Sequence, residues 1–61
     1  MDREKIIAII KDESEKLGLT YEAAMSWLSE LNFELDAVVG NPIFDESKVR
    51  TAVAMAYHAF A

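Results

Sequence analysis

Hydrophobic residues recur at helical spacing in three stretches of this chain, and two glycines separate the stretches. In the first stretch, isoleucines fall on one helical face, and the polar run KDESEK that follows them lacks the alternation of a strand. Asp2 is a suitable N-cap, and Gly18 is suited to a left-handed stop at the C-terminus. This pattern predicts an amphipathic helix over about residues 2–17. The residues of its apolar face are Ile6, Ile10 and Leu17.

The second stretch supports two interpretations. Apolar residues spaced by three and four continue from Thr20, a good N-cap, almost to Gly40, which predicts one helix over about residues 20–39. The segment 33–39 also alternates between apolar and polar residues, as a strand does. On that alternative the helix stops near Asn32, and residues 33–39 form a strand that pairs between chains. The residues at helical spacing are Ala24, Leu28, Leu31, Leu35 and Val38.

The third stretch opens with a clear helix start. Asp45 is placed as the N-cap, and Phe44 and Val49 have the spacing of a hydrophobic staple around it. The predicted helix covers about residues 45–60. The fold class is therefore all-α, with three short amphipathic helices packed as a small bundle in which each helix runs antiparallel to the next in sequence.

Length and composition indicate that the chain, residues 1–61, is a single small helical domain completed by oligomerisation. A chain of 61 residues with 52% hydrophobic residues buries a limited core and keeps excess apolar surface. No cysteine and one histidine argue against a disulfide framework or a zinc site, and no cofactor is expected. A dimer is the simplest assembly. The predicted self-association residues are Ala52, Val53, Ala56, Tyr57 and Phe60.

The net charge of −5 is unevenly distributed. Between Leu17 and Ser47 there are six acidic residues and no basic one, which suits either a solvated face or a surface for a basic partner protein. This distribution argues against nucleic-acid binding, because phosphate contacts need Lys and Arg. In a continuous second helix Phe33 would be exposed among polar residues as an interface anchor, whereas a break would bury it in the core. The predicted partner-binding residues are Glu30, Phe33 and Glu34.

Catalytic and ligand-binding chemistry receives less support. Aromatic residues together with Lys48 or Arg50 would suit an anionic, nucleotide-like ligand bound between chains, although aromatic residues at helical spacing are usually core. His58 is the single histidine, and no acidic neighbour in sequence orients it. No catalytic motif is present, so the chain is predicted not to be an enzyme. A helix-turn-helix interpretation of KLGLTYEAAMSWLSELN lacks basic residues on its second helix.

The sequence thus predicts a small acidic helical protein that acts by protein–protein binding, as an inhibitor, adaptor or regulatory subunit. An inhibitor of a host enzyme carried by a phage or mobile element fits this description. A ligand-binding oligomer and a structural assembly component are the alternatives. No apolar run approaches the ~20 residues of a membrane span, and MDREKIIAII does not resemble a secretory signal. The expected location is the cytoplasm, and the partner's identity is open.

Overall fold

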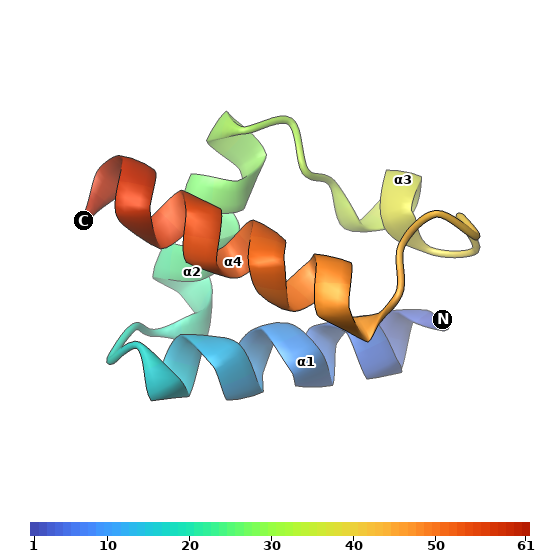
Figure 1. Cartoon of the computed structure of the whole chain (residues 1–61), viewed down its shortest axis with the longest axis horizontal. Helices are drawn as coiled ribbons and strands as arrows, with labels where there is room; N and C mark the ends of the chain where they lie inside the picture. The colour runs from blue at the N-terminus through green and yellow to red at the C-terminus, as the bar shows by residue number, and fades with distance from the viewer.

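A computed structural model describes all 61 residues as four helices with no strand. The helices are α1 (Arg3–Lys16), α2 (Tyr21–Glu30), α3 (Leu35–Val38) and α4 (Glu46–Phe60), as Figure 1 shows. The all-α prediction is confirmed. The prediction of three helices is wrong in its middle part, because the segment expected to be one helix over 20–39 is divided into α2 and α3.

The ends of α1 form as the sequence predicts. The carboxylate of Asp2 accepts a hydrogen bond from the backbone N–H of Lys5 at 2.8 Å, which satisfies a free donor of the first turn. Gly18 closes the helix with a φ of +76°, a left-handed conformation that its missing Cβ permits. The N–H of Leu19 then reaches back to the carbonyl of Ser14 at 2.9 Å. This pairing across the end of a helix is a Schellman motif.

The same motif ends α2 and answers the ambiguity of the second stretch. Thr20 caps the start of α2, but the helix stops at Glu30 because Asn32 adopts a φ of 64°. The N–H of Asn32 bonds to the Ser29 carbonyl at 3.0 Å, and the N–H of Phe33 bonds to the Leu28 carbonyl at 2.9 Å. Asparagine is the residue other than glycine that most readily takes this conformation at a helix end. The predicted continuous helix is therefore wrong. Of the alternative, the helix end near Asn32 is confirmed, and the strand over 33–39 is wrong because this segment contains α3.

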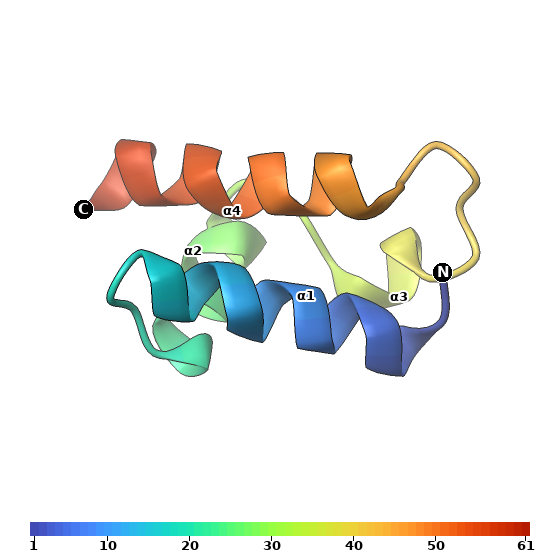
Figure 2. The same ribbon diagram turned by 60° about the horizontal axis from the view of Figure 1, so that its bottom comes forward.

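The helices do not form an antiparallel bundle. α1 and α4 lie side by side and run in the same direction, while α2 and α3 pack against one side of this pair (Figures 1 and 2). α2 contacts both α1 and α4 and crosses them instead of lying alongside. The expected antiparallel order is wrong, because α2 crosses the pair and the chain then passes through α3 back to the end of the molecule at which α1 starts.

The core collects apolar side chains from all four helices and from the link between α2 and α3. Phe33 belongs to it, with 8% of its surface exposed, and its ring meets that of Phe44 edge-on at a centroid distance of 5.7 Å. The N-terminus holds α3 in place, since Arg3 pairs with Asp36 at 2.7 Å. The core residues are Ile6, Ile9, Ile10, Ala24, Leu28, Phe33, Val38, Val49, Val53 and Ala56.

Candidate interaction surface

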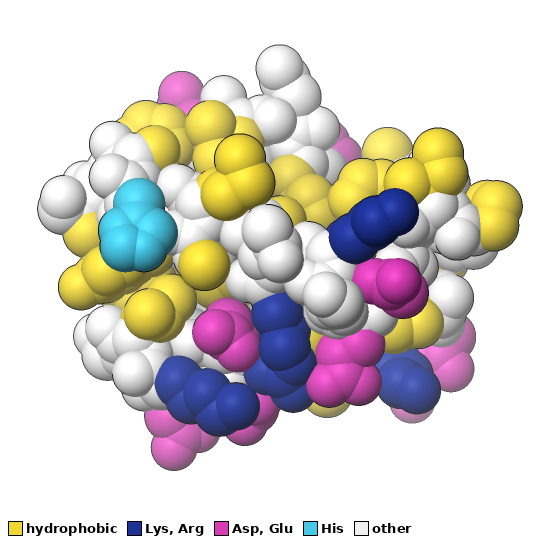
Figure 3. Space-filling view, viewed as in Figure 1, with side chains coloured by type: hydrophobic (Ala, Val, Ile, Leu, Met, Phe, Trp, Pro, Cys, Tyr) yellow, Lys and Arg dark blue, Asp and Glu magenta, His cyan; other side chains and the backbone are white.

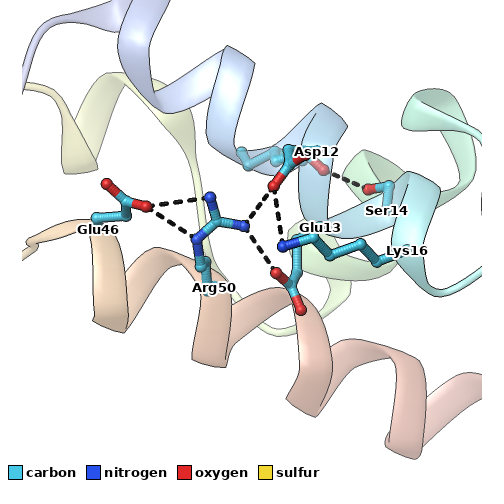
Figure 4. A network of polar contacts seen from close by, with 7 residues as sticks. Asp12, Glu13, Ser14, Lys16, Glu46 and Arg50 are labelled. Atoms are coloured by element: carbon cyan, nitrogen blue, oxygen red, sulfur yellow. Dashed lines mark hydrogen bonds and ion pairs between the residues drawn. The ribbon is translucent and has the colours of Figure 1, made fainter.

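The most connected polar group of the molecule is a cluster of charges between α1 and α4 (Figure 4). One nitrogen of Arg50 on α4, Nη1, donates to Asp12 Oδ2 at 2.7 Å and to Glu13 Oε1 at 2.8 Å, both on α1. Its Nε donates to Glu46 Oε2, one turn earlier on α4, at 3.1 Å. Lys16 also pairs with Asp12 at 3.3 Å. The cluster therefore ties the two parallel helices together across their boundary.

These contacts leave Arg50 poorly suited to an incoming anion. Hydrogen bonds from Arg50 first, and from Lys16 second, lower the pKa of Asp12 below its ordinary value, and the three carboxylates raise the pKa of Arg50. A phosphate would have to displace carboxylates that already occupy the guanidinium. Lys48 cannot assist, because two residues on a helix correspond to a rotation of about 200°. The structure thus places the two predicted anion-binding residues on different flanks of α4.

Ion pairing also lowers the number of unpaired carboxylates in the acidic middle segment of the chain. Asp36 is paired with Arg3 from a distant segment, and Glu46 is paired with Arg50 one helical turn away, so two of the six carboxylates between Leu17 and Ser47 lie in ion pairs. Asp45 uses its carboxylate to cap α4 through the N–H of Lys48 at 2.9 Å. The exposed carboxylates of this segment that lie in no ion pair and cap no helix are those of Glu22, Glu30 and Glu34.

Two of these carboxylates belong to residues at the end of α2 and just beyond it. Glu30 is the last residue of the helix, and Glu34 accepts a hydrogen bond from the Ser29 hydroxyl at 3.0 Å. Leu31 lies between them in sequence with 43% of its surface exposed. We refer to Glu30, Leu31 and Glu34 as the α2 corner. Phe33 does not belong to it, so its predicted exposure is wrong: the break at Asn32 turns Phe33 into the core and leaves Leu31 outside.

The predicted self-association residues also differ from one another in their burial. Val53 and Ala56 are buried within the chain itself, which corrects the expectation that they face a second molecule. Ala52 and Tyr57 are half-buried. Phe60 is 43% exposed, and it stacks on Trp27 of α2 with ring centroids 6.3 Å apart. Phe60, near the end of α4, therefore joins α4 to α2.

Met55, which was not among the predicted site residues, is the most exposed large hydrophobic residue of α4, at 61%. It belongs to a row on one flank of the helix, whose members are spaced by four, three and four residues and therefore lie one above the other. Because Arg50 reaches α1 from the other flank, this row faces away from α1. We refer to the row as the α4 flank. Its residues are Lys48, Ala52, Met55 and Ala59.

The α4 flank and the α2 corner lie on one side of the molecule, which we term the outer side. Figure 1 shows that α2 passes behind the C-terminal half of α4 and that its end emerges beyond α4, on the side away from α1. The stacking of Trp27 on Phe60 marks the point where α2 crosses α4. Glu30 and Leu31 lie one helical turn after Trp27, so they come after this crossing point. Figure 3 shows hydrophobic side chains gathered over this region of α4 and α2, whereas charged side chains line the boundary between α1 and α4.

The fourth exposed large apolar residue, after Leu31, Met55 and Phe60, lies on the turn before α4. Ile43 is 62% exposed on the turn that precedes α4. Asn41 holds this turn, because its side chain accepts from the Ile43 N–H at 3.0 Å and its carbonyl accepts from the Phe44 N–H at 3.1 Å. His58, the only histidine, is exposed and meets the ring of Tyr57 edge-on at 5.6 Å.

The structure adds no pocket or metal site to these surfaces, and comparison of the chain with known proteins finds no match. The structure contains no pocket and no group of three or more His, Asp or Glu side chains arranged to hold a metal ion. None of its helices combines the length and the apolar character needed to cross a bilayer. No protein-family model, no curated protein and no solved structure matches the chain.

Proposed function

We propose that this chain acts by binding another protein through the outer side, as an inhibitor, adaptor or regulatory subunit without catalysis of its own. The observation that carries the proposal is the α2 corner, where an exposed leucine lies between two carboxylates that no cation neutralises. We place this activity in the cytoplasm, since a chain without cysteine suits a reducing compartment. The expected partner presents an apolar contact surrounded by Lys or Arg.

The physical basis is the combination of apolar area and charge. Removing apolar surface from water contributes about 25 cal/mol per Å², so covering Leu31 favours association. Unpaired carboxylates around such a contact attract a basic partner over longer distances and select against acidic ones. Within the corner, the hydrogen bond from Ser29 holds the Glu34 side chain in a fixed position before any partner arrives. That restriction lowers the entropy lost on binding.

Charge reversal of the corner tests the proposal. We would capture partners from cells that express the protein naturally, using the wild-type chain and the variant that combines Glu30→Lys with Glu34→Lys. The matched control combines Glu4→Lys with Glu15→Lys, because both glutamates are exposed on α1 and lie in no ion pair. The two variants carry the same change in net charge. Circular dichroism would verify that each retains its helices.

The expected result is a partner that the wild type and the α1 control retain and the corner variant loses. If the corner variant and the control bind this partner equally well, the α2 corner is only a solvated face. Equal loss from both variants would show an effect of total charge without a specific surface, and this outcome would also overturn the proposal.

A further inference from the structure

We infer that one partner of the outer side is a second copy of this chain, which pairs about a two-fold axis so that Lys48 of each copy meets the α2 corner of the other. This inference rests on the proposed function, because it names the basic group that the corner would bind. The two copies would place their α4 flanks against each other in antiparallel orientation. Such a contact is isologous, so each residue pairing occurs twice.

Charge complementarity within one face supports a second copy as the occupant. Lys48 lies at the N-terminal end of the α4 flank, is exposed and lies in no ion pair. Glu30 ends α2, which emerges near the C-terminal half of α4 (Figure 1), and Glu34 follows four residues later. The outer side therefore carries its positive charge at one end and its negative charge at the other. A two-fold rotation about the middle of the face brings each lysine to the carboxylates of the other copy.

The centre of this face has the composition of a helix contact. Met55 is 61% exposed, and its flexible, unbranched side chain adapts to the surface that it meets. Ala52 and Ala59 lie on either side of it along the α4 flank and are small enough to let another helix approach closely. Leu31 adds exposed apolar surface from the end of α2. The apolar centre and the charged ends together resemble the core and rim of a protein interface.

The size of the chain explains why both elements must take part. Its total accessible surface is 3870 Å², and a standard interface covers about 800 Å² on each partner, roughly a fifth of that total. One flank of one helix is too narrow for such an area, whereas the α4 flank and the α2 corner together span the outer side. Two molecules of net charge −5 repel each other, so the dimer depends on these local contacts to offset the repulsion.

The first experiment removes the apolar centre. Sedimentation velocity over protein concentrations from about 1 µM to about 1 mM should show the wild type passing from monomer to dimer. Met55→Ser should weaken the dimer about tenfold or more, and Ile43→Ser is the matched control because Ile43 is equally exposed but lies on the turn before α4. A wild type that remains monomeric throughout would overturn the inference. An equal effect of both substitutions would also overturn it, since the contact would then lie elsewhere.

The second experiment exchanges the charges. Lys48→Glu alone, and Glu30→Lys with Glu34→Lys, should each weaken the dimer about tenfold or more because like charges then face each other. Combining all three substitutions should restore it, whereas Lys5→Glu on α1, an exposed lysine in no ion pair, should have no comparable effect. Failure of the triple variant to restore the dimer would refute the pairing.

The outcomes separate this inference from the proposed function. A monomeric chain whose corner variant still loses a captured partner would refute the dimer and leave the partner surface intact. If the triple variant restores the dimer as expected, but the corner variant loses no captured partner, the dimer stands and the proposed surface for another protein is refuted.

Discussion

Replacing Asn32 with alanine should change the stability of the protein in opposite directions, depending on whether residues 20–39 form one helix or are divided at Asn32. In a continuous helix over 20–39, alanine would stabilise the protein, because it exceeds asparagine in helix propensity by about 0.5 kcal/mol. In the structure, Asn32 has a φ of 64° and is followed by the hydrogen bond from the Phe33 N–H to Leu28. Alanine lacks the local hydrogen bonding that helps asparagine adopt this conformation. The expected effect is therefore destabilisation.

The magnitude follows from the left-handed backbone. That conformation costs an ordinary L-residue about 1–2 kcal/mol, and asparagine bears less of this cost, so Asn32→Ala should lower the free energy of unfolding by about 1 kcal/mol. For a domain of this size, such a change lowers Tm by about 4–8 °C. Asn32→Gly should have a much smaller effect, because relief of the backbone is offset by the greater freedom of glycine in the unfolded chain.

Thermal and urea unfolding followed by circular dichroism would measure these differences. Gly18→Ala serves as the comparison, because Gly18 holds the equivalent position at the end of α1 and nothing lies within 4 Å of the Cβ that alanine would add. Both alanine variants should be less stable than the wild type for the same backbone reason. An Asn32→Ala protein that is more stable than the wild type would refute the Schellman turn and restore the continuous helix.

Further predictions concern the core, the charge cluster and a helix cap. Phe33→Ala should cost about 3–5 kcal/mol in equilibrium unfolding, whereas Leu31→Ala should cost far less; equal costs would contradict the burial difference. Because the pKa of Asp12 is lowered on folding, its ion pair contributes fully above the unfolded pKa of about 3.9 and is lost as pH falls through the folded value. Arg50→Gln should therefore reduce the loss of stability between about pH 5 and about pH 2, and an unchanged acid profile would exclude this linkage. Asp45→Ala should cost about 1 kcal/mol in urea unfolding, since it removes the bond to the Lys48 N–H.

Local signals in the sequence were sufficient for the helix starts. Asp2, Thr20 and Asp45 each accept a hydrogen bond from the backbone N–H three residues later, as their positions before apolar runs predict. Gly18 likewise ends α1 in the expected left-handed conformation. A cap depends on a few neighbouring residues, so its signal survives without knowledge of the rest of the fold.

The break after α2 was predicted only as the alternative, because the spacing of apolar residues continues across it. Leu28 in α2 and Val38 in α3 both enter the core, so the three-four spacing persists although the helix stops. A signal was nevertheless present. Leu17-Gly18-Leu19 and Leu31-Asn32-Phe33 share a leucine, a residue tolerant of positive φ and a large apolar residue, and both form the same turn. Comparing the two segments would have indicated the second helix end and the burial of Phe33.

The charged surface could be predicted from sequence only in part. The Asp45 cap and the pair of Glu46 with Arg50 are local, but the other ion pairs that matter join distant segments. Arg3 and Asp36 are 33 residues apart, and Arg50 and Asp12 are 38 residues apart. Counting charges along the chain therefore gave six acidic residues in the middle segment, whereas folding removes two of them by pairing and assigns a third to a helix cap.

The folded surface also changes which cation matters for binding. Arg50 and Lys48 are equivalent candidates in the sequence, but the three carboxylates around Arg50 already satisfy its guanidinium, while Lys48 remains exposed and unpaired at the end of the α4 flank. An unpaired charge is the one that gains most from a partner, because its interaction replaces water instead of an existing ion pair. The same reasoning selects Glu30 and Glu34 over Asp36 and Glu46. Lys48, Glu30 and Glu34 are among the groups that folding leaves unpaired, and we place them on the outer side, at opposite ends of its exposed apolar residues.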